Sequence, residues 1–301
     1  MLSRVANNLF WIGRYMERSY GILLTTRIGF SEAQNFENQK IENNNLVIEE
    51  VNTAKSVNTI LFDSSDPNSI FNIAYKTREN ARSIQEQISR ELWLCINKQY
   101  LFLRNNSAIK SVIEDEDPLK ILDELLNMNA LYYGIADLTQ ERGSPYCFMN
   151  CGKYIERIFR NIDFLDKNFI RVDKNSSTGI EDSVYWKNLL LSIGGYQLFL
   201  RTYKSVFDID NIFEMLISNT NFPHSIYYAV KKLETHLSRL NIQNNKENNE
   251  LLFLIGKLES KLKYTKLSSI KEIGFDNFIK SAQNDISEIS MTFNKYYFSN
   301  Y

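Results

Sequence analysis

The stretch WIGRYMERSY, at residues 11–20, returns in a related form as NCGKYIERIF at residues 150–159. Both copies carry the pattern Gly-x-Tyr-x-Glu-Arg, and the four matching residues keep one constant offset along the chain. On a helix, a glycine lets a second helix approach closely, and a carboxylate beside an apolar stripe needs a charged or hydrogen-bonding partner. The stretch therefore predicts a helix that packs tightly against a neighbour.

A second motif repeats in the same order as the first. DPNSIFNIAY at 66–75 is echoed by FPHSIYYAVK at 222–231, and both contain Pro-x-Ser-Ile. Two ordered matches indicate an internal duplication, whereas either motif alone would carry little weight. We therefore predict a single domain over 1–301, built from two pseudo-repeated halves of about 1–115 and 118–301 that are related by a pseudo-two-fold axis.

The spacing of apolar residues predicts an all-α fold. In the first segment they recur every three or four positions, as on one face of a helix: Leu2, Val5, Leu9, Ile12, Met16, Tyr20 and Leu23. Trp11 and Tyr15 form a second stripe on the opposite side, so this helix is expected to lie between neighbours. Asn-Gly and Asp-Gly hairpin turns are absent from the sequence. We predict a helical bundle of about eight to ten helices.

The first third of the chain is expected to contain three helices. The first ends at about residue 28, a loop or short helix covers 30–45, and a helix covers 46–62. A single long helix is then predicted over 67–104, with a break in the pattern at 105–117.

Later helix starts follow from prolines and from polar runs. A proline after a good N-cap residue predicts a start at Pro67, Pro118 and Pro145. Other starts are expected at Pro223 and near Glu181, Asn211, Glu247 and Ile270. Composition predicts loops at 172–179 and 241–248.

The composition is that of an ordinary globular protein. The 35 basic and 36 acidic side chains give a net charge of −1, which argues against a dedicated nucleic-acid binder. Three cysteines do not make a disulfide framework, and no run approaches the ~20 apolar residues of a membrane span. The first residues lack the apolar core of a signal peptide. We expect a cytoplasmic protein with no membrane and no nucleic-acid partner.

The two Glu-Arg motifs form the first candidate site: Arg14, Glu17, Arg18, Glu156 and Arg157. One interpretation, which we favour, is a buried ion-pair network that fixes the register of two helices. The other is a polar cleft for an anionic or zwitterionic ligand, such as a phosphate or a peptide. In the first interpretation the carboxylates form ion pairs within the protein, whereas in the second they line a cleft and can contact a ligand.

A second candidate cluster lies in TRENARSIQEQISRE at 77–91. Its polar members are Arg78, Glu79, Asn80, Arg82, Glu86 and Glu91. On the long helix predicted here, Arg82–Glu86 and Glu86–Arg90 form a ladder of pairs one turn apart. Such pairs on a solvated face contribute little, at about 0.3–0.5 kcal/mol each, and this is the favoured interpretation. Alternatively, the cluster lines a groove between the two halves.

Metal and cofactor chemistry is not indicated by the sequence. Only His224 and His236 occur, without a Glu-x-x-His motif, and Cys147 and Cys151 lack a second ligand pair. His224 is interpreted as a surface or capping residue because it follows a helix-starting proline. We assign no cofactor, no metal and no catalytic residue, and an enzyme is the less favoured class.

The ordered motifs resemble the bacterial alpha-E domain family, whose members are all-helical proteins without an assigned activity. The resemblance covers nearly the whole chain and rests on LSRVANNLFWIGRYMER, DPNSI, TRENARSIQEQISRELWLCIN, GKYIERIFRNIDFLD, YWKNLLLSIGGYQLFLRTY and NFPHSIYYAV. This chain differs where the family usually carries arginine in a Phe-Pro-Arg-Ser turn, because it has His224 there. It also has SPYCF where the family usually places a tryptophan ahead of the second Glu-Arg helix.

The resemblance implies partners rather than a reaction. By this resemblance, the protein is expected to be a neighbour or fusion partner of a circularly permuted ATP-grasp-like protein. A transglutaminase-like protein is often expected beside them. This context implies a non-catalytic partner, or a substrate-presenting subunit, of an ATP-grasp-type peptide or amide ligase. The alternative is an enzyme or small-ligand-binding protein with a polar Glu/Arg cleft between the halves. A homo-oligomeric scaffold is a third interpretation.

Overall fold

A computed structural model describes most of the chain. The described residues are 2–39, 54–105, 118–169, 180–204, 207, 209–241 and 247–298. Within these ranges the protein contains thirteen α-helices, one short 3-10 turn and no strand. The prediction of an all-α fold is confirmed, although the helices outnumber the eight to ten that were expected.

The helices fall into two parts in chain order. The first part contains α1 (Ser3–Gln39), α2 (Ala54–Phe62), α3 (Ile70–Arg82), the 3-10 turn η1 (Gln85–Gln87), α4 (Arg90–Arg104) and α6 (Pro118–Thr139). The second part contains α7 (Ser144–Phe169), α8 (Ile180–Ser192), α9 (Tyr196–Tyr203), α10 (Ile209–Ile217), α11 (Ile226–Asn241), α12 (Glu247–Tyr264), α13 (Leu267–Ile273) and α14 (Phe275–Phe298).

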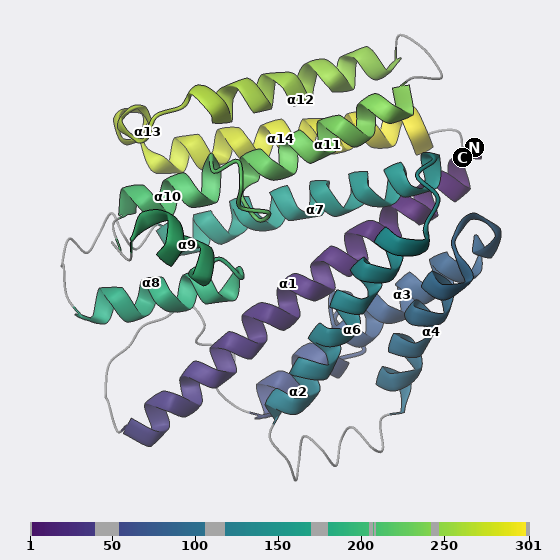
Figure 1. Ribbon diagram of the computed structural model, residues 1–301, viewed down its shortest axis with the longest axis horizontal. Helices are drawn as coiled ribbons and strands as arrows, with labels where there is room; N and C mark the ends of the chain where they lie inside the picture. Colours follow the sequence, from purple (N-terminus) through teal and green to yellow (C-terminus); the bar gives the residue numbers. More distant parts are fainter. Residues whose placement is uncertain are drawn as a thin grey trace.

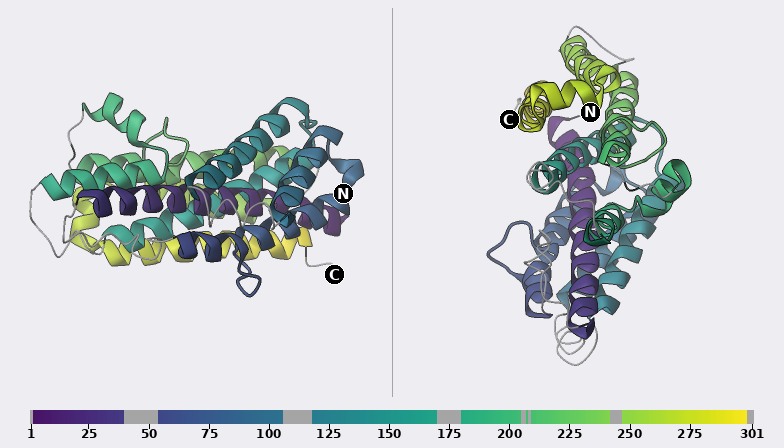
Figure 2. Two further views of the ribbon diagram at one scale, coloured as in Figure 1. Left: turned by 90° about the horizontal axis from the view of Figure 1, so that it is seen from below. Right: turned by 90° about the vertical axis from the view of Figure 1, so that its left-hand side faces the viewer.

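Two long helices, α1 and α7, lie at the centre and run in the same direction (Figure 1). On one side of α1 lie α3, α4 and α6, and on the far side of α7 lie α11, α12 and α14 (Figures 1 and 2). The start of α1 meets the end of α14, where the rings of Phe10 and Phe298 are 5.3 Å apart. The central pair therefore joins the early helices to the late ones.

Two glycines allow α1 and α7 to cross at very short range. A Cβ atom on Gly13 would overlap the backbone carbonyl of Met149, and a Cβ on Gly152 would overlap the carbonyl of Phe10. Only glycine leaves the room that this backbone approach needs. The repeated Gly-x-Tyr-x-Glu-Arg pattern thus places both Glu-Arg dipeptides at one helix crossing. The glycine of each copy had indicated such a close approach of a second helix.

Two apolar cores hold the helices together. The smaller core uses α1, α2, α3, α4 and α6: Leu23, Phe30, Val57, Leu61, Ile70, Ala74, Leu103, Ile121, Leu122, Leu125 and Met128. The larger core surrounds α7 and takes in the start of α1, parts of α3, α4 and α6, and helices α8 to α14. Burial of such apolar area is the main favourable term in folding. The sequence placed α6 in the second half, but it packs largely with the first helices.

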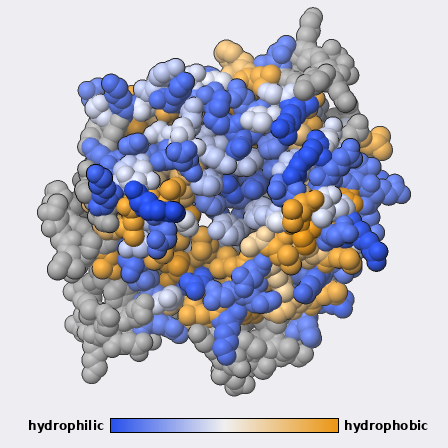
Figure 3. Space-filling model, in the orientation of Figure 1, coloured by the Kyte–Doolittle hydropathy of each residue, from blue (hydrophilic) through white to orange (hydrophobic). Residues whose placement is uncertain are grey.

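The surface differs between the two parts of the molecule. On the face shown in Figure 3, hydrophilic residues predominate over α11 and α12, whereas a hydrophobic band crosses α8, α1 and α6. The exposed apolar side chains include Leu131 and Leu138 on α6. None of the described helices is both long enough and apolar enough to cross a bilayer.

The first helix is longer than predicted. It continues to Gln39, through residues 30–39 that were expected to form a loop or a short helix. This segment contains neither glycine nor proline, so its polar residues can extend the helix. The helix expected at 46–62 appears as α2 over its last nine residues, Ala54–Phe62, and its earlier part lies outside the described residues.

The prediction of a single helix over 67–104 was wrong, because the structure has α3, η1 and α4 in its place. Ser89 caps α4, since its hydroxyl accepts a hydrogen bond from the amide of Leu92 at 3.2 Å. The turn lets α4 pack back on α3, so both helices bury an apolar face. The missed signal was a serine N-cap followed by the acidic Glu91 in the first turn.

Two of the proline-based starts need correction. The caps are Ser69 and Ser225, two residues after Pro67 and Pro223, so α3 and α11 begin three residues later than expected. Pro118 does begin α6, and α7 starts one residue before Pro145, as predicted within a residue. The remaining starts lie within three residues of their predicted positions. The loop predicted at 172–179 and most of those at 105–117 and 241–248 lie outside the described residues.

Candidate functional site

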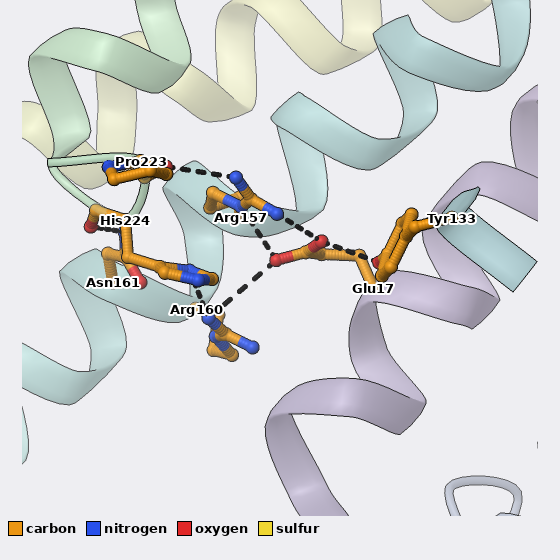
Figure 4. Close-up of polar contacts among 7 residues, drawn as sticks. All are labelled: Glu17, Tyr133, Arg157, Arg160, Asn161, Pro223 and His224. Carbon is orange, nitrogen blue, oxygen red and sulfur yellow. Dashed lines mark hydrogen bonds and ion pairs between the residues drawn. The ribbon is translucent and has the colours of Figure 1, made fainter. Parts of the chain in front are cut away.

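The Glu17 carboxylate on α1 is the centre of a buried polar cluster (Figure 4). Its side chain is 0% exposed. The Arg157 guanidinium on α7 donates from Nε and Nη2 to the two carboxylate oxygens, each at 2.7 Å. The Tyr133 hydroxyl on α6 donates to Oε2 at 2.8 Å. This bidentate arrangement is the strongest geometry for an arginine–carboxylate pair.

Arg160 and His224 complete the Glu17 cluster (Figure 4). Arg160 lies 3.6 Å from Oε1 of Glu17 and contacts Nδ1 of His224 at 3.3 Å. The His224 ring stacks on Tyr20 with 5.8 Å between centroids, and its carbonyl accepts from Asn161. The interpretation of His224 as a surface or capping residue was wrong, because the turn after Pro223 carries its ring into this cluster.

Ionisation states in the cluster follow from burial and from neighbouring charges. Burial raises the pKa of Glu17, but the Arg157 charge and hydrogen bonds outweigh it and hold that pKa well below its usual range. Burial lowers the pKa of Arg157, but the Glu17 charge and hydrogen bonds outweigh it, so the pKa of Arg157 lies above its ordinary value. The pKa of Tyr133 is raised, first by burial and then by the Glu17 charge. Glu17 and Arg157 are therefore both charged at neutral pH.

The Glu156 carboxylate on α7 has its own pair of arginines from α1. Arg14 donates from Nε to Oε2 at 2.7 Å, and Arg18 donates from Nε to Oε1 at 2.6 Å. The Arg14 guanidinium also lies 5.0 Å from the centroid of the Trp11 ring, within range of a cation–π contact. Burial opposes the charge of Arg18, but its hydrogen bond to Glu156 leaves the pKa of Arg18 raised.

The ion pairs between the two copies of the motif are reciprocal. Glu17 of the first copy binds Arg157 of the second, and Glu156 of the second binds Arg18 of the first. Each of these arginines also contacts the Pro-x-Ser-Ile turn of its own copy: Arg157 donates to the Pro223 carbonyl and Arg18 to Asn68, both at 2.9 Å. This crossing has local two-fold character. A duplication of whole halves stays a prediction.

The second predicted cluster lies apart, around the turn between α3 and α4. Arg78 donates to Asn97 at 2.8 Å, and Glu79 pairs with both Arg78 and Arg82 at 2.6 Å. Asn80 is half-buried beside them, whereas Glu86 in η1 and Glu91 at the start of α4 are exposed. The Arg82–Glu86 pair across one helical turn does not form, because α3 ends at Arg82.

The eleven predicted residues therefore do not line one cleft. Five of them gather at the α1–α7 crossing, where both carboxylates are ion-paired. The other six lie on α3, η1 and α4. This arrangement matches the ion-pair network rather than an open Glu/Arg cleft at the motif.

A cavity of about 530 Å³, which the sequence did not predict, lies between α6, α7 and α11. Its lining includes Tyr133, Lys153, Tyr154, Lys232, His236 and Arg239. Lys153 replaces Arg14 at the equivalent position of the repeat, and this replacement was the available signal. Tyr133 separates the Glu17 cluster from the cavity, since its hydroxyl bonds to Glu17 while its ring lines the space.

Metal ligands do not gather in the part of the chain that the structure describes. No group of three or more His, Cys, Asp or Glu side chains there could hold an ion. Cys95, Cys147 and Cys151 are buried and free, and burial raises the pKa of each thiol. The cation-lined cavity has instead the chemistry of an anion site.

Comparison with known proteins places the chain in a family. The family model that matches residues 1–298 is described as a predicted alpha-helical domain with a conserved ER motif. Two such dipeptides, Glu17-Arg18 and Glu156-Arg157, lie at the helix crossing described above. Among curated proteins and solved structures, none matches this chain. The match extends over almost the full length, and the chain belongs to the Alpha-E family.

Proposed function

We propose that this Alpha-E chain is a non-catalytic helical partner, or substrate-presenting subunit, of an ATP-grasp-type peptide or amide ligase. The ligase class comes from the sequence resemblance, which implies a circularly permuted ATP-grasp-like partner and also a transglutaminase-like one. The observation that carries the non-catalytic part is the reciprocal pairing of the Glu-Arg motifs, in which Glu17 and Glu156 each bind arginine from the other helix.

A general base must reach the proton that it removes, at about 2.6–3.2 Å, and its pKa should lie near the working pH. Glu17 meets neither condition, because it is fully buried and its pKa is held low by Arg157 after burial is overcome. Glu156 is 6% exposed and saturated by two arginines. The motif thus favours a structural role, and the proposed function places ATP-dependent chemistry on the partner, in the cytoplasm.

Capture of the partner from the native host tests this proposal. The tagged chain, expressed at its natural level and crosslinked in cells, is expected to recover an ATP-grasp-like protein in a near-equimolar amount. Recovery of the folded chain alone, or only of further copies of itself, would contradict the proposal and favour the homo-oligomeric scaffold.

Two glycine variants test whether capture of the partner requires the α1–α7 crossing. Gly13→Ala forces apart the α1–α7 crossing and is expected to lose the partner, because a Cβ there meets the Met149 carbonyl. Gly134→Ala is the matched control, since a Cβ on Gly134 has no atom within 4 Å, and it is expected to keep the partner. Equal capture by both variants would indicate non-specific adhesion.

A second candidate function, small-ligand binding, is favoured by a different observation. The cavity between α6, α7 and α11 is lined by several cations and by tyrosine rings, and it does not use the motif carboxylates. This candidate agrees with a substrate-presenting subunit, but it can be tested on the purified chain without any partner.

A further inference from the structure

The cavity between α6, α7 and α11 has a buried aromatic floor and a charged rim. Tyr132, Tyr154 and His236 on its lining are each less than a tenth exposed. Arg142 and Arg239 are exposed at its edge. A volume of about 530 Å³ is in the range of small-molecule sites, which are clefts with a few well-placed polar groups.

Lys153 is a half-buried cation on the lining of this cavity. Its Nζ lies 4.2 Å from the centroid of the Tyr133 ring and 5.3 Å from that of Tyr154. Among the described residues no carboxylate or carbonyl is within hydrogen-bond distance of this amine, whereas Arg14, at the equivalent position of the repeat, is paired with Glu156. Burial, followed by the Arg157 charge, lowers the pKa of Lys153 to about 8. The amine is therefore a donor without an acceptor.

His236 offers a second unsatisfied group on the same lining. It is 7% exposed, and its Nδ1 is buried without a hydrogen-bond partner. Its ring is fixed by stacking on Tyr154 at 5.9 Å and by an edge contact with Tyr146 at 5.7 Å. Burial, with the charges of Arg239 and Lys153, lowers the pKa of His236 to about 4. A buried polar atom normally has a partner, and no described protein group supplies one for Nδ1 of His236.

The remaining charges give the cavity a positive balance. Lys153, Lys232 and Arg239 have no acidic partner among the described residues, and Asp137, the acidic residue on the lining, is 2.8 Å from Arg142. Cations that converge on one concave space attract an anion. Tyrosine rings beside them provide flat apolar surface for the body of the molecule that carries the anion.

We infer that this cavity binds a small organic anion, with a carboxylate or phosphate group seated on Lys153 and His236 and its body against the tyrosine rings. The anion supplies the acceptor that Lys153 lacks and a partner for Nδ1 of His236. This site goes beyond the proposed partnership, because it requires only the folded chain.

Isothermal titration calorimetry of the full chain tests the inference with matched pairs of probes. The pairs are adenosine 5′-monophosphate against adenosine, and phenylacetate against phenylacetamide, with inorganic phosphate and citrate as further anions. At least one organic anion is expected to bind ten-fold or more tightly than its neutral counterpart. The pair that shows the difference identifies phosphate or carboxylate as the group recognised. Absence of binding by every anion at 10 mM would overturn the inference.

Variants on one helix localise the binding. Lys153→Met is expected to weaken the best anion at least ten-fold, while Lys153→Arg keeps part of the affinity. Lys167→Met, on the same α7, is the control, because Lys167 is exposed and pairs with Asp163 at 2.9 Å away from the cavity. Circular dichroism confirms folding of each variant. Equal affinity of Lys153→Met and Lys167→Met would contradict this location.

The pH dependence of binding gives a readout that a purely structural lysine would not move. The groups that face Lys153 come from four helices: Glu17 on α1, Tyr133 and Asp137 on α6, Arg157 on α7, and Lys232, His236 and Arg239 on α11. A bound anion raises the pKa of Lys153, so affinity is constant well below pH 8 and falls as the pH rises through that value, where binding takes up a proton. Affinity that is flat from pH 7 to 9.5 would overturn the role of Lys153.

Discussion

Lys153 and Arg157 lie one turn apart on α7, yet their surroundings are opposite. Arg157 makes two hydrogen bonds to the buried Glu17 and a third to the Pro223 carbonyl. Lys153 faces a cavity with aromatic rings around its amine and no acceptor among the described residues. One helix therefore carries both a satisfied and an unsatisfied cation at the same crossing.

The difference separates a structural group from a binding group. A buried cation with a bidentate carboxylate holds two helices in register, and removing either partner leaves an uncompensated charge. A cation without a partner lowers the stability of the empty protein, and this cost is relieved only when a ligand supplies the acceptor. The repeat sharpens the contrast, because Arg14 is paired where Lys153 is not.

The largest effect is expected at the paired end of this comparison. Glu17→Gln keeps the side-chain shape but leaves Arg157 buried without a countercharge, so the free energy of unfolding should fall by about 3–5 kcal/mol. Glu156→Gln should cost less, about 1–3 kcal/mol, because Arg14 and Arg18 are partly exposed to water. Urea denaturation at pH 7 measures both variants, and a larger loss at Glu156 would contradict the ranking.

Acid should narrow the gap between wild type and Glu17→Gln. Folding lowers the pKa of Glu17 from 4.5, so its contribution is complete above that value and is lost as the pH falls towards the lower folded pKa. The difference in unfolding free energy should therefore be largest at pH 7 and smaller at pH 3. A gap that widens in acid would show that the carboxylate is not the stabilising group.

The helix crossing itself gives the next largest effect. Gly13→Ala should lower the free energy of unfolding by about 3 kcal/mol, because the new Cβ overlaps the Met149 carbonyl and the helices must separate. Gly134→Ala adds the same methyl group where no atom lies within 4 Å, and it should stabilise by about 0.5–1 kcal/mol. Thermal unfolding distinguishes them, and a similar loss for both would mean that the crossing is not tight.

The unpaired end of the comparison predicts a smaller change of opposite sign. Folding lowers the pKa of Lys153 from 10.5 to about 8. Between these pH values the unfolded chain binds more protons than the folded chain, so the contribution of Lys153 to the free energy of unfolding rises with pH. Lys153→Met should stabilise the protein at pH 7 by about 1–2 kcal/mol after solvent screening. This advantage should shrink from pH 8 to 10.5 in urea titrations, and a constant difference would contradict the assignment.

The repeated turns give the smallest predicted effect. The Ser69 hydroxyl accepts from the amide of Asn72 at 3.3 Å, and the Ser225 hydroxyl accepts from that of Tyr228 at 3.0 Å. Ser69→Ala should cost about 1 kcal/mol, as for other helix N-caps, and Ser225→Ala slightly more because Ser225 also donates to a carbonyl. Denaturant midpoints measure both, and no change in either variant would show that the serines do not cap.

Sequence periodicity predicted the all-α fold. The glycine of each motif indicated a near helix, and the carboxylate beside it indicated a partner, which are local properties of residues such as Gly13 and Glu17. Which arginine binds which carboxylate could not be predicted, because the exchange between α1 and α7 depends on the crossing geometry. The extension of α1 to Gln39 was missed because polar residues fit a helix and a loop equally well.

The cavity was missed for a different physical reason. A lysine in GKYIER is compatible with a solvated helix face, and only the packing of α6 and α11 against α7 places Lys153 on the lining of a cavity. His236 gave no signal either, because the stacking on Tyr154 joins residues far apart in the sequence. Unsatisfied groups of this kind are products of tertiary structure, and the replacement of Arg14 by Lys153 in the repeat was the one local trace.

The most direct test measures Arg157→Met and Lys153→Met side by side in urea denaturation at pH 7. The two variants make the same type of change one turn apart on α7. We predict opposite signs: Arg157→Met loses about 3–5 kcal/mol because Glu17 stays buried and loses its bidentate partner, with only the longer Arg160 contact left, and Lys153→Met is more stable than wild type. Loss of stability in both variants would contradict the division of this crossing into a paired structural cation and an unpaired binding cation.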